Sequence, residues 1–219
     1  MSSKFIEKLL SIGSPALGRE EVVINLENFA SFGRLGEELL AMLNLKNGFY
    51  AFESALQVFP AAHFAQEMTL SRWNSHGLWK FEYDGIADGK LFFAQEAFGN
   101  QFCIFQDQVW FFDAETGNVE FCADSMEGWA EKILSDYEMQ TAYPFMHHWQ
   151  KANGSIEPGH RLMPKMPFVL GGDFKLTNLY SLNAVSAMRF RGYLANQIKD
   201  LPDGTKIEFK IIDRCVRIQ

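Results

Sequence analysis

The sequence has little of what marks several familiar classes of protein. Its three cysteines, Cys103, Cys122 and Cys215, are an odd number without CxxC spacing, which argues against a disulfide scaffold and favours reduced thiols. Lysine and arginine number 20 against 27 aspartates and glutamates, for a formal net charge of -7. Because nucleic-acid binders need basic patches, this balance argues against a nucleic-acid partner and is compatible with a basic protein partner.

Targeting signals are also missing from the N-terminal stretch. A single lysine, Lys4, precedes a short apolar run that Glu7 and Lys8 interrupt. Such a stretch matches neither a signal peptide nor a membrane span. We therefore expect a cytoplasmic protein that does not associate with a membrane.

Catalytic and metal-binding signatures are scarce as well. The sequence has no HExxH and no GxSxG, and the Gly171-Gly172 pair lacks the Lys-Ser/Thr of a phosphate-binding loop. His147 and His148 are adjacent, so on a helix they point about 100° apart and cannot chelate one ion together. We expect no catalytic residue, no cofactor and no metal.

Aromatic residues, by contrast, are abundant, with 21 Phe and 5 Trp in 219 residues. They concentrate in Leu91 to Cys122, where turn signals separate short apolar runs. Gly99-Asn100, Gln106-Asp107-Gln108 and the segment from Asp113 to Gly117 are typical hairpin turns. The stretch therefore predicts an antiparallel meander of four strands, apolar at successive positions, so that both of its faces need cover.

The flanking sequence predicts mainly helices. Helical spacing and end signals favour helices at Ser3 to Ile12, Arg34 to Leu45, Phe49 to Pro60, Thr141 to Asn153, and after a capping box at Asp124 and Glu127, with Asn183 capping a final helix. Shorter strands are expected at Phe168 to Leu170 and around Ile207, Phe209 and Ile211. Residues 20–32 stay open between strand and helix, and residues 61–89 are expected to form a helix, a loop and one strand.

Several motifs together, in this order, carry a family resemblance. They are the leucine-rich helix ending at Asn47-Gly48, the segment finishing at Val58-Phe59-Pro60, the turn at Gly99-Asn100, the strand with Trp110, the hairpin from Asp113 to Gly117, and a helix with Trp129. Over roughly residues 34–134 this order resembles the SUKH superfamily, which includes fungal cell-wall-assembly regulators and bacterial Syd-like proteins. The resemblance implies an α+β fold, a central curved antiparallel meander with helices packed on one face.

On this resemblance we divide the chain into two parts. Residues 1–160 would form the SUKH-like domain with an N-terminal helical arm, and residues 161–219 a C-terminal extension packed on it. Many bacterial members of the family look like immunity proteins that neutralise a cognate toxin.

The function that we expect from these observations is therefore binding without catalysis. The partner would be a protein, for example a basic toxin domain, held at an exposed concave sheet face. Exposed aromatic patches rimmed by acid are typical of such surfaces. The candidate partner-binding residues are the acids and aromatics of the meander: Glu96, Asp107, Trp110, Phe111, Asp113 and Glu115.

Other interpretations remain open at this point. Asp113 fits equally well as the start of an Asx turn that caps its own hairpin. The chain could instead be a small-molecule sensor or enzyme with a pocket between the sheet and residues 61–89. It could also be a scaffold that regulates cell-envelope assembly.

Overall fold

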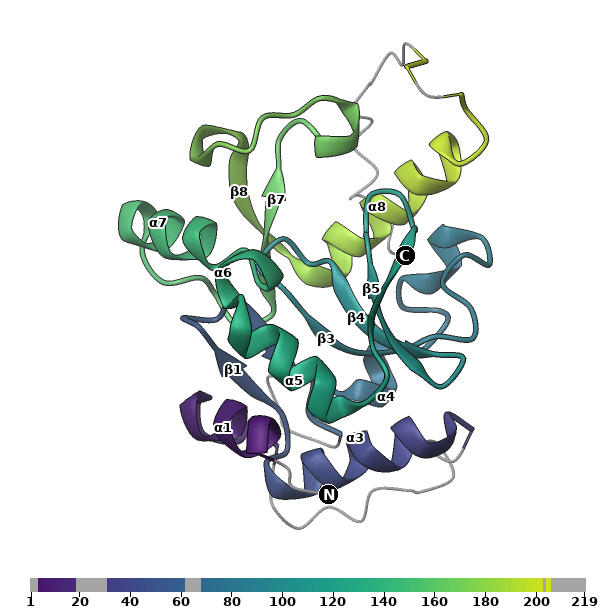
Figure 1. Ribbon diagram of the computed structural model, residues 1–219. Coiled ribbons are helices and arrows are strands. Elements are labelled where there is room, and N and C mark those ends of the chain that lie inside the picture. Colours follow the sequence, from purple (N-terminus) through teal and green to yellow (C-terminus); the bar gives the residue numbers. More distant parts are fainter. Residues whose placement is uncertain (1–3, 19–30, 62–67, 203, 206–219) are drawn as a thin grey trace.

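The computed structural model describes residues 4–18, 31–61, 68–202 and 204–205 (Figure 1). Its centre is a six-stranded antiparallel sheet in the order β1-β2-β3-β4-β5-β6, and β7 and β8 form a separate two-stranded sheet. The strands are β1 (Phe49–Ala51), β2 (Leu56–Val58), β3 (Leu91–Gln95), β4 (Gln101–Phe105), β5 (Gln108–Phe112), β6 (Val119–Ala123), β7 (His160–Pro164) and β8 (Leu179–Asn183). Helices pack against the larger sheet, so the predicted α+β class is confirmed.

The helices are distributed along the whole described chain. They are α1 (Lys4–Ile12), α3 (Gly33–Leu45), α4 (Leu70–Trp73), α5 (Met126–Ser135), α6 (Tyr137–Gln140), α7 (Tyr143–Asn153) and α8 (Ala184–Ile198). Three 3-10 turns join them: η1 (Lys80–Tyr83), η2 (Phe168–Leu170) and η3 (Leu176–Asn178). Within the described ranges, none of these helices is long and apolar enough to cross a membrane.

The meander follows the predicted turns closely, with β3 to β6 adjacent in the sheet. Gln106 and Asp107, at the β4–β5 turn, both have a positive φ, as a tight two-residue hairpin requires. Gly99 and Gly117 also have positive φ values, of 83° and 77°, at the other two turns. Local turn chemistry therefore sets the strand boundaries of this part of the sheet.

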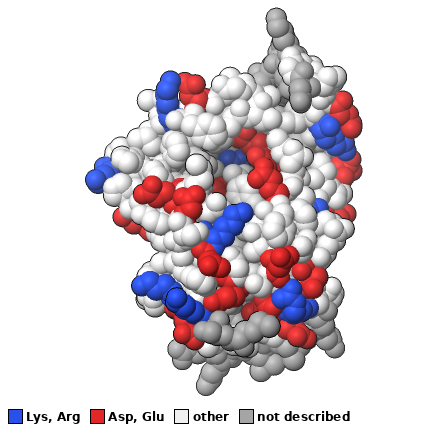
Figure 2. All heavy atoms as spheres, in the orientation of Figure 1, with Lys and Arg blue, Asp and Glu red and all other residues white. Residues whose placement is uncertain are grey.

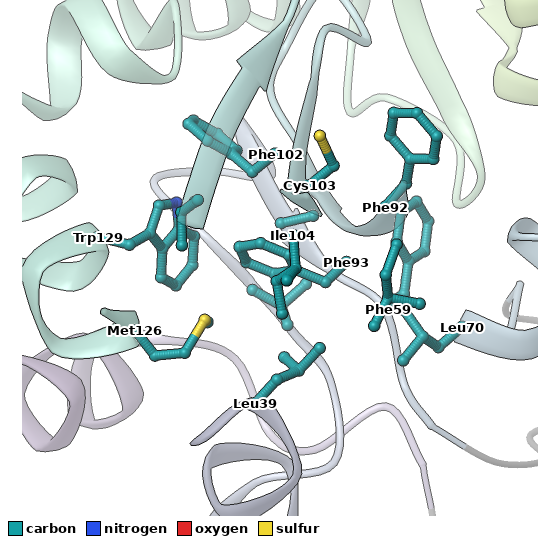
Figure 3. Packing of buried hydrophobic residues seen from close by; sticks show 14 of the residues in the cluster. Leu39, Phe59, Leu70, Phe92, Phe93, Phe102, Cys103, Ile104, Met126 and Trp129 are labelled. Carbon is teal, nitrogen blue, oxygen red and sulfur yellow. The ribbon is translucent and has the colours of Figure 1, made fainter. Parts of the chain in front are cut away.

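Both faces of the sheet are covered at β3 and β4, so the expected exposed concave face does not extend over these central strands. On one face, Phe93 and Phe102 pack against Trp129 of α5, with ring centroids 5.0 and 5.8 Å apart (Figure 3). On the other, Phe92 packs against Trp79, the residue before η1, at 5.0 Å. The helices α4 and α8 and the turn η1 form a second layer on this other face. The residues of β3 and β4 are therefore almost entirely buried.

A line of glutamines crosses the sheet on the side of this second layer. Gln95 Nε2 donates to Gln57 Oε1 at 2.7 Å, and Gln101 Nε2 donates to Gln95 Oε1 at 3.3 Å. Trp73 Nε1 donates to Gln101 Oε1 at 2.9 Å, and Arg161 Nη2 donates to Gln57 Oε1 at 2.6 Å. These buried amides are hydrogen-bonded across β2, β3 and β4, as burial of polar groups requires.

Most of the predicted helices are present. The helices expected at Ser3 to Ile12, Arg34 to Leu45 and Thr141 to Asn153 correspond to α1, α3 and α7, and Asn183 Oδ1 accepts from the first turn of α8. The capping box is different: Ser125, not Asp124, caps α5 through a bond from Gly128 N. Glu127 turns to a neighbouring helix and accepts the N–H groups of Phe5 and Ile6 in α1.

Three expected elements are wrong. The segment Phe49 to Pro60 forms the β1–β2 hairpin instead of a helix, because its aromatic side chains belong to a sheet edge whose pairing partner is distant in the sequence. Residues 168–170 form η2 instead of a strand. In residues 61 and 68–89, the described part of the third segment, the structure has α4 and η1 and no strand.

Some expectations fall on residues that the structure does not describe. The strand around Ile207, Phe209 and Ile211 lies outside the described residues, as do residues 20–30 of the segment left open. The domain boundary at residue 160 stays a prediction.

Candidate functional site

Glu96, one of the predicted surface acids, lies inside the protein. Its side chain is 2% exposed and its carboxylate accepts the N–H groups of Phe98 and Asn100 at 2.8 to 3.0 Å. Burial raises the pKa of the Glu96 carboxyl to about 7, against the opposing effect of these bonds and of Arg191 and Arg161. Glu96 therefore holds the β3–β4 turn and is not part of an exposed acidic rim.

Glu115 is also buried, which corrects its expected place on that rim. Its Oε1 lies 4.0 Å from Nε of the buried Arg191, and its Oε2 accepts the N–H of Val169 at 2.9 Å. Burial raises the pKa of this carboxyl, and the Arg191 charge opposes the shift. Glu115 therefore connects the β5–β6 turn to the segment that joins β7 and β8.

The two remaining acids shape turns. Asp113 Oδ1 accepts the N–H groups of Glu115 and Thr116 at 2.8 and 2.9 Å, which is the Asx turn that the sequence allowed. Asp107 is exposed, and its Oδ1 accepts the N–H of Leu35 at 3.3 Å at the start of α3. The four predicted acids thus do not form one acidic surface. In Figure 2 the acidic side chains are spread over the visible face, with basic ones among them.

Trp110 and Phe111 cannot anchor the same partner on one face. They are successive residues of β5, and the register pairs Trp110 with Cys103 and Phe111 with Phe102 on opposite faces. Both rings are half-buried. Trp110 lies 6.0 Å from the ring of Phe121, which is 48% exposed on the edge strand β6, so only the Trp110 side offers an aromatic pair to solvent.

A group of exposed apolar side chains lies elsewhere, on the loop between β7 and β8. We call residues 165–178 the β7–β8 loop. Four of its large apolar side chains reach solvent: Met166 at 45% exposure, Val169 at 41%, Phe174 at 61% and Leu176 at 37%. In Figure 1 the loop lies at the top of the two-stranded sheet. Exposed apolar side chains concentrated in this way mark interaction surfaces.

This loop is fixed by its own contacts. Asn178 accepts from Met166 N at 2.9 Å and donates to the carbonyl oxygens of Met166 and Asp173, each at 3.0 Å. The rings of Phe168 and Phe174 stack at 4.0 Å. At Gly172 an added Cβ would lie 1.9 Å from Met166 O, so only glycine allows this approach. The exposed side chains therefore stand on an ordered backbone.

A second group of partly exposed side chains lies where the β1–β2 turn meets α6 and α7. We call its four rings, Phe52, Tyr137, Tyr143 and His147, the aromatic ladder. Consecutive ring centroids lie 4.8, 5.3 and 5.5 Å apart, and Phe52 and Tyr137 are stacked.

Glu53, from the same turn, contacts two of these rings. The Tyr143 hydroxyl donates to Glu53 Oε1 at 3.2 Å, and His147 Nδ1 lies 2.8 Å from Glu53 Oε2. The hydrogen bond with His147 lowers the pKa of Glu53, while desolvation and then Glu53 raise the pKa of Tyr143.

In the described part of residues 61–89, where a pocket beside the sheet was the alternative expectation, aromatic rings pack on the sheet. Trp73, Trp79 and Tyr83, from residues 68–89, are 0 to 1% exposed. Trp79 contacts Phe92 at 5.0 Å, and Tyr83 contacts Phe112 at 5.4 Å. In the described part of the chain, no three His, Cys, Asp or Glu side chains come together in a metal-binding arrangement.

Few local patterns indicated the surfaces that the structure exposes. Pro164, Pro167 and Gly171-Gly172 indicated a loop, but not that its apolar side chains would point outward. The exposure of Phe121 depends on its position at a sheet edge. The contact of Glu53 with α7 joins residues about 90 positions apart. Such long-range placement has no local sequence signal.

Comparison with known proteins identifies the fold only. No family model and no curated protein matches this sequence. The crystal structure of Atu4351 from Agrobacterium tumefaciens is similar, with a TM-score of 0.56 and 15% sequence identity. The similarity covers 85% of this chain and 87% of that one.

Proposed function

We propose that this chain is a non-enzymatic, cytoplasmic protein-binding module of the SUKH type. Its function would be that of a bacterial immunity protein, which neutralises a toxin by covering its working surface. The observation that carries the proposal is the β7–β8 loop, an ordered segment that presents four exposed apolar side chains.

The order of the loop supports binding by insertion into a partner. Association loses free energy when flexible side chains and loops become fixed, so a segment that is already fixed binds more tightly for the same contacts. The Asn178 bonds and the Phe168–Phe174 stack provide that order before any partner arrives. Phe174 and Met166 would then fill an apolar recess of the toxin, where aromatic anchors contribute most.

The net charge supports the choice of partner. A chain of formal charge -7 attracts a basic protein over a distance and speeds the encounter, an effect that salt weakens. A basic toxin domain that acts on an acidic substrate is a partner of this kind. Occlusion of such a domain requires no chemistry from the immunity protein.

The test is co-expression of the full chain with the product of the neighbouring gene, with cell growth as the readout. We expect the wild-type chain to restore growth and the double variant Met166→Ser/Phe174→Ser to lose most of this protection. Leu45→Ser is the matched control, because Leu45 is an apolar side chain on α3 that is 66% exposed. Met166 and Leu45 are exposed, so their replacement changes stability little. Phe174 also stacks on Phe168, so the single variant Met166→Ser, which keeps that stack, is measured beside the double variant.

Two results would contradict the proposal. One is that the wild-type chain neither protects against the neighbouring product nor binds it when both are purified. The other is that the double variant protects as well as Leu45→Ser does, which would remove the β7–β8 loop from the interface.

A further inference from the structure

Helix α7 takes part in both the β7–β8 loop contacts and the aromatic ladder. The ring of Phe145, two residues from both Tyr143 and His147, lies 6.3 Å from the ring of Phe174 in the loop and 5.2 Å from Phe98. Because residues two apart on a helix point in nearly opposite directions, the loop and the ladder use different sides of α7. The ladder differs from the loop in carrying carboxylates beside its rings.

We propose that the aromatic ladder, with Glu53 and Glu138, is a recognition site for an arginine side chain of the partner protein. This inference rests on the proposed function and adds the chemistry of one contact. The site lies between the β1–β2 turn and the α6–α7 pair, outside the residues that the sequence singled out.

Charge favours a cationic occupant. The Glu53 side chain is 50% exposed, and Asp136 and Glu138 of the α5–α6 junction are exposed as well. Glu138 is close enough to Tyr143 to help raise the pKa of its hydroxyl. Lys151 is the lysine whose charge acts on Glu53, so the carboxylates of Glu53 and Glu138 lie near one lysine, beside His147. Figure 2 shows acidic side chains gathered over the region of α6.

The rings favour arginine over lysine. A guanidinium is planar, so it stacks on an aromatic face while its N–H groups reach a carboxylate beside the ring. Tyr137 and Tyr143 are half-buried, and their neighbours Glu53 and Glu138 supply the carboxylates. An ammonium group pairs with the carboxylates but does not stack in this way.

Glu53 is held in position for this contact. Gln150 Nε2 donates to the carbonyl oxygen of Glu53 at 2.8 Å, and the Tyr143 and His147 contacts fix its carboxylate. An ionised carboxylate offers about four acceptor positions. Two protein contacts therefore leave room for a guanidinium, and little side-chain freedom is lost when it binds.

The test uses small probes and the full chain. N-acetyl-arginine amide is added to the 15N-labelled protein, and backbone amide shifts are followed by NMR. We expect saturable shifts confined to residues 52–54 and 137–148. N-acetyl-citrulline amide has nearly the same shape without the charge and is expected to give none. Equal shifts with both probes, or arginine shifts located elsewhere, would overturn the proposal.

Variants test the role of the carboxylates. We expect Glu53→Gln to weaken arginine-amide binding about two- to fivefold, the size of an exposed cation–π or ion-pair contact. Because Glu53 lies in a strained turn, Glu138→Gln provides a second variant on a regular helix and is expected to weaken binding in the same range. Glu120→Gln, an exposed acid on β6, is the control. Unchanged binding in both Glu53→Gln and Glu138→Gln would contradict the assignment.

The two proposals fail in different ways. Loss of protection in the loop variant together with no arginine binding would reject the arginine site alone. If arginine binds at the ladder and the loop variant still protects fully, the β7–β8 loop is not the surface that binds the toxin.

Discussion

Glu96 carries a buried carboxyl group, and its surroundings shift the pKa of this group in opposite directions. Burial disfavours the charged form, whereas the bonds from Phe98 N and Asn100 N and the nearby arginines favour it. Burial dominates and raises the pKa of Glu96 to about 7, above the ordinary value of 4.5. Glu96 therefore binds a proton more readily in the folded chain than in the unfolded one.

A measurable pH dependence follows from this residue. Because the folded-state pKa is raised, the contribution of Glu96 to stability is fully present below about pH 4.5 and is lost as pH rises towards 7. We expect the unfolding free energy of the wild type to fall relative to that of Glu96→Gln by up to about 1.4 kcal/mol per pH unit in this window. Urea unfolding between pH 4.5 and 8 measures this difference. Parallel curves for the two proteins would contradict it.

The buried acids also show what the sequence could predict at the scale of a residue. Asp113 was recognisable as a turn former because its partners, Glu115 N and Thr116 N, lie two and three positions away. Glu96 and Glu115 were expected to be exposed because carboxylates usually are. Arg191, which accompanies Glu115 inside, is 76 positions further along the chain, and no local pattern announces such a pair.

At the scale of elements, one carboxylate joins two helices. Glu127 belongs to α5, but its oxygens accept from Phe5 N at 2.7 Å and Ile6 N at 3.1 Å, at the start of α1. The first N–H groups of a helix have no partner within it, so Glu127 serves as an external cap for α1. This contact attaches the N-terminal helix to the sheet layer.

Removal of this cap is expected to loosen α1. For Glu127→Ala we expect a loss of about 1 to 2 kcal/mol in the unfolding free energy and faster hydrogen exchange at Phe5 and Ile6. The matched control is Glu131→Ala, because Glu131 is an exposed acid on the same helix. Exchange at α1 that is equally slow in both variants would show that the cap contributes nothing.

Elements were predicted well where their signals are local. The turns of the meander were found from glycine and Asx residues, and Leu39 and its neighbours marked α3 by helical spacing. The helix predicted for Phe49 to Pro60 is wrong because the pattern was ambiguous. Phe49, Phe52, Leu56 and Phe59 have helical spacing, but pairing with β3 makes this segment a pair of strands. Strand β7 was missed because its five residues contain Pro164 and show no alternation.

At the scale of the whole molecule, two buried arginines attach the C-terminal segment to the large sheet. Arg161 of β7 donates to Gln57 of β2, and Arg191 of α8 donates to the carbonyl oxygen of Phe98 after β3. Each side chain is 1% exposed. The β7–β8 pair and α8 therefore depend on polar contacts inside the protein for their position.

Loss of one arginine is expected to be costly. Arg191→Met leaves the buried Glu115 without the positive charge beside it and the Phe98 carbonyl without its donor, and we expect a loss of about 3 to 5 kcal/mol in the unfolding free energy. The double variant Arg191→Met/Glu115→Gln should recover part of this loss, because it removes the unpaired charge. Urea unfolding followed by tryptophan fluorescence measures both changes.

A control on the same helix separates charge from packing. Arg189 is half-buried and donates to the carbonyl oxygen of Leu78 at 2.7 Å, without a buried acid beside it. Arg189→Met should cost no more than about 1 to 1.5 kcal/mol. Equal losses for Arg189→Met and Arg191→Met would contradict a special role for the interior pair.

The β1–β2 turn has a consequence for the order in which the molecule assembles. Phe52, Glu53 and Ser54 have φ values of 50°, 52° and 70°, and each left-handed L-residue costs about 1 to 2 kcal/mol. The hairpin is therefore uphill by itself, and the contacts of α7 with Glu53, about 90 residues later, help to offset this cost. On a ribosome, this edge of the sheet gains those contacts only after the middle of the chain has emerged.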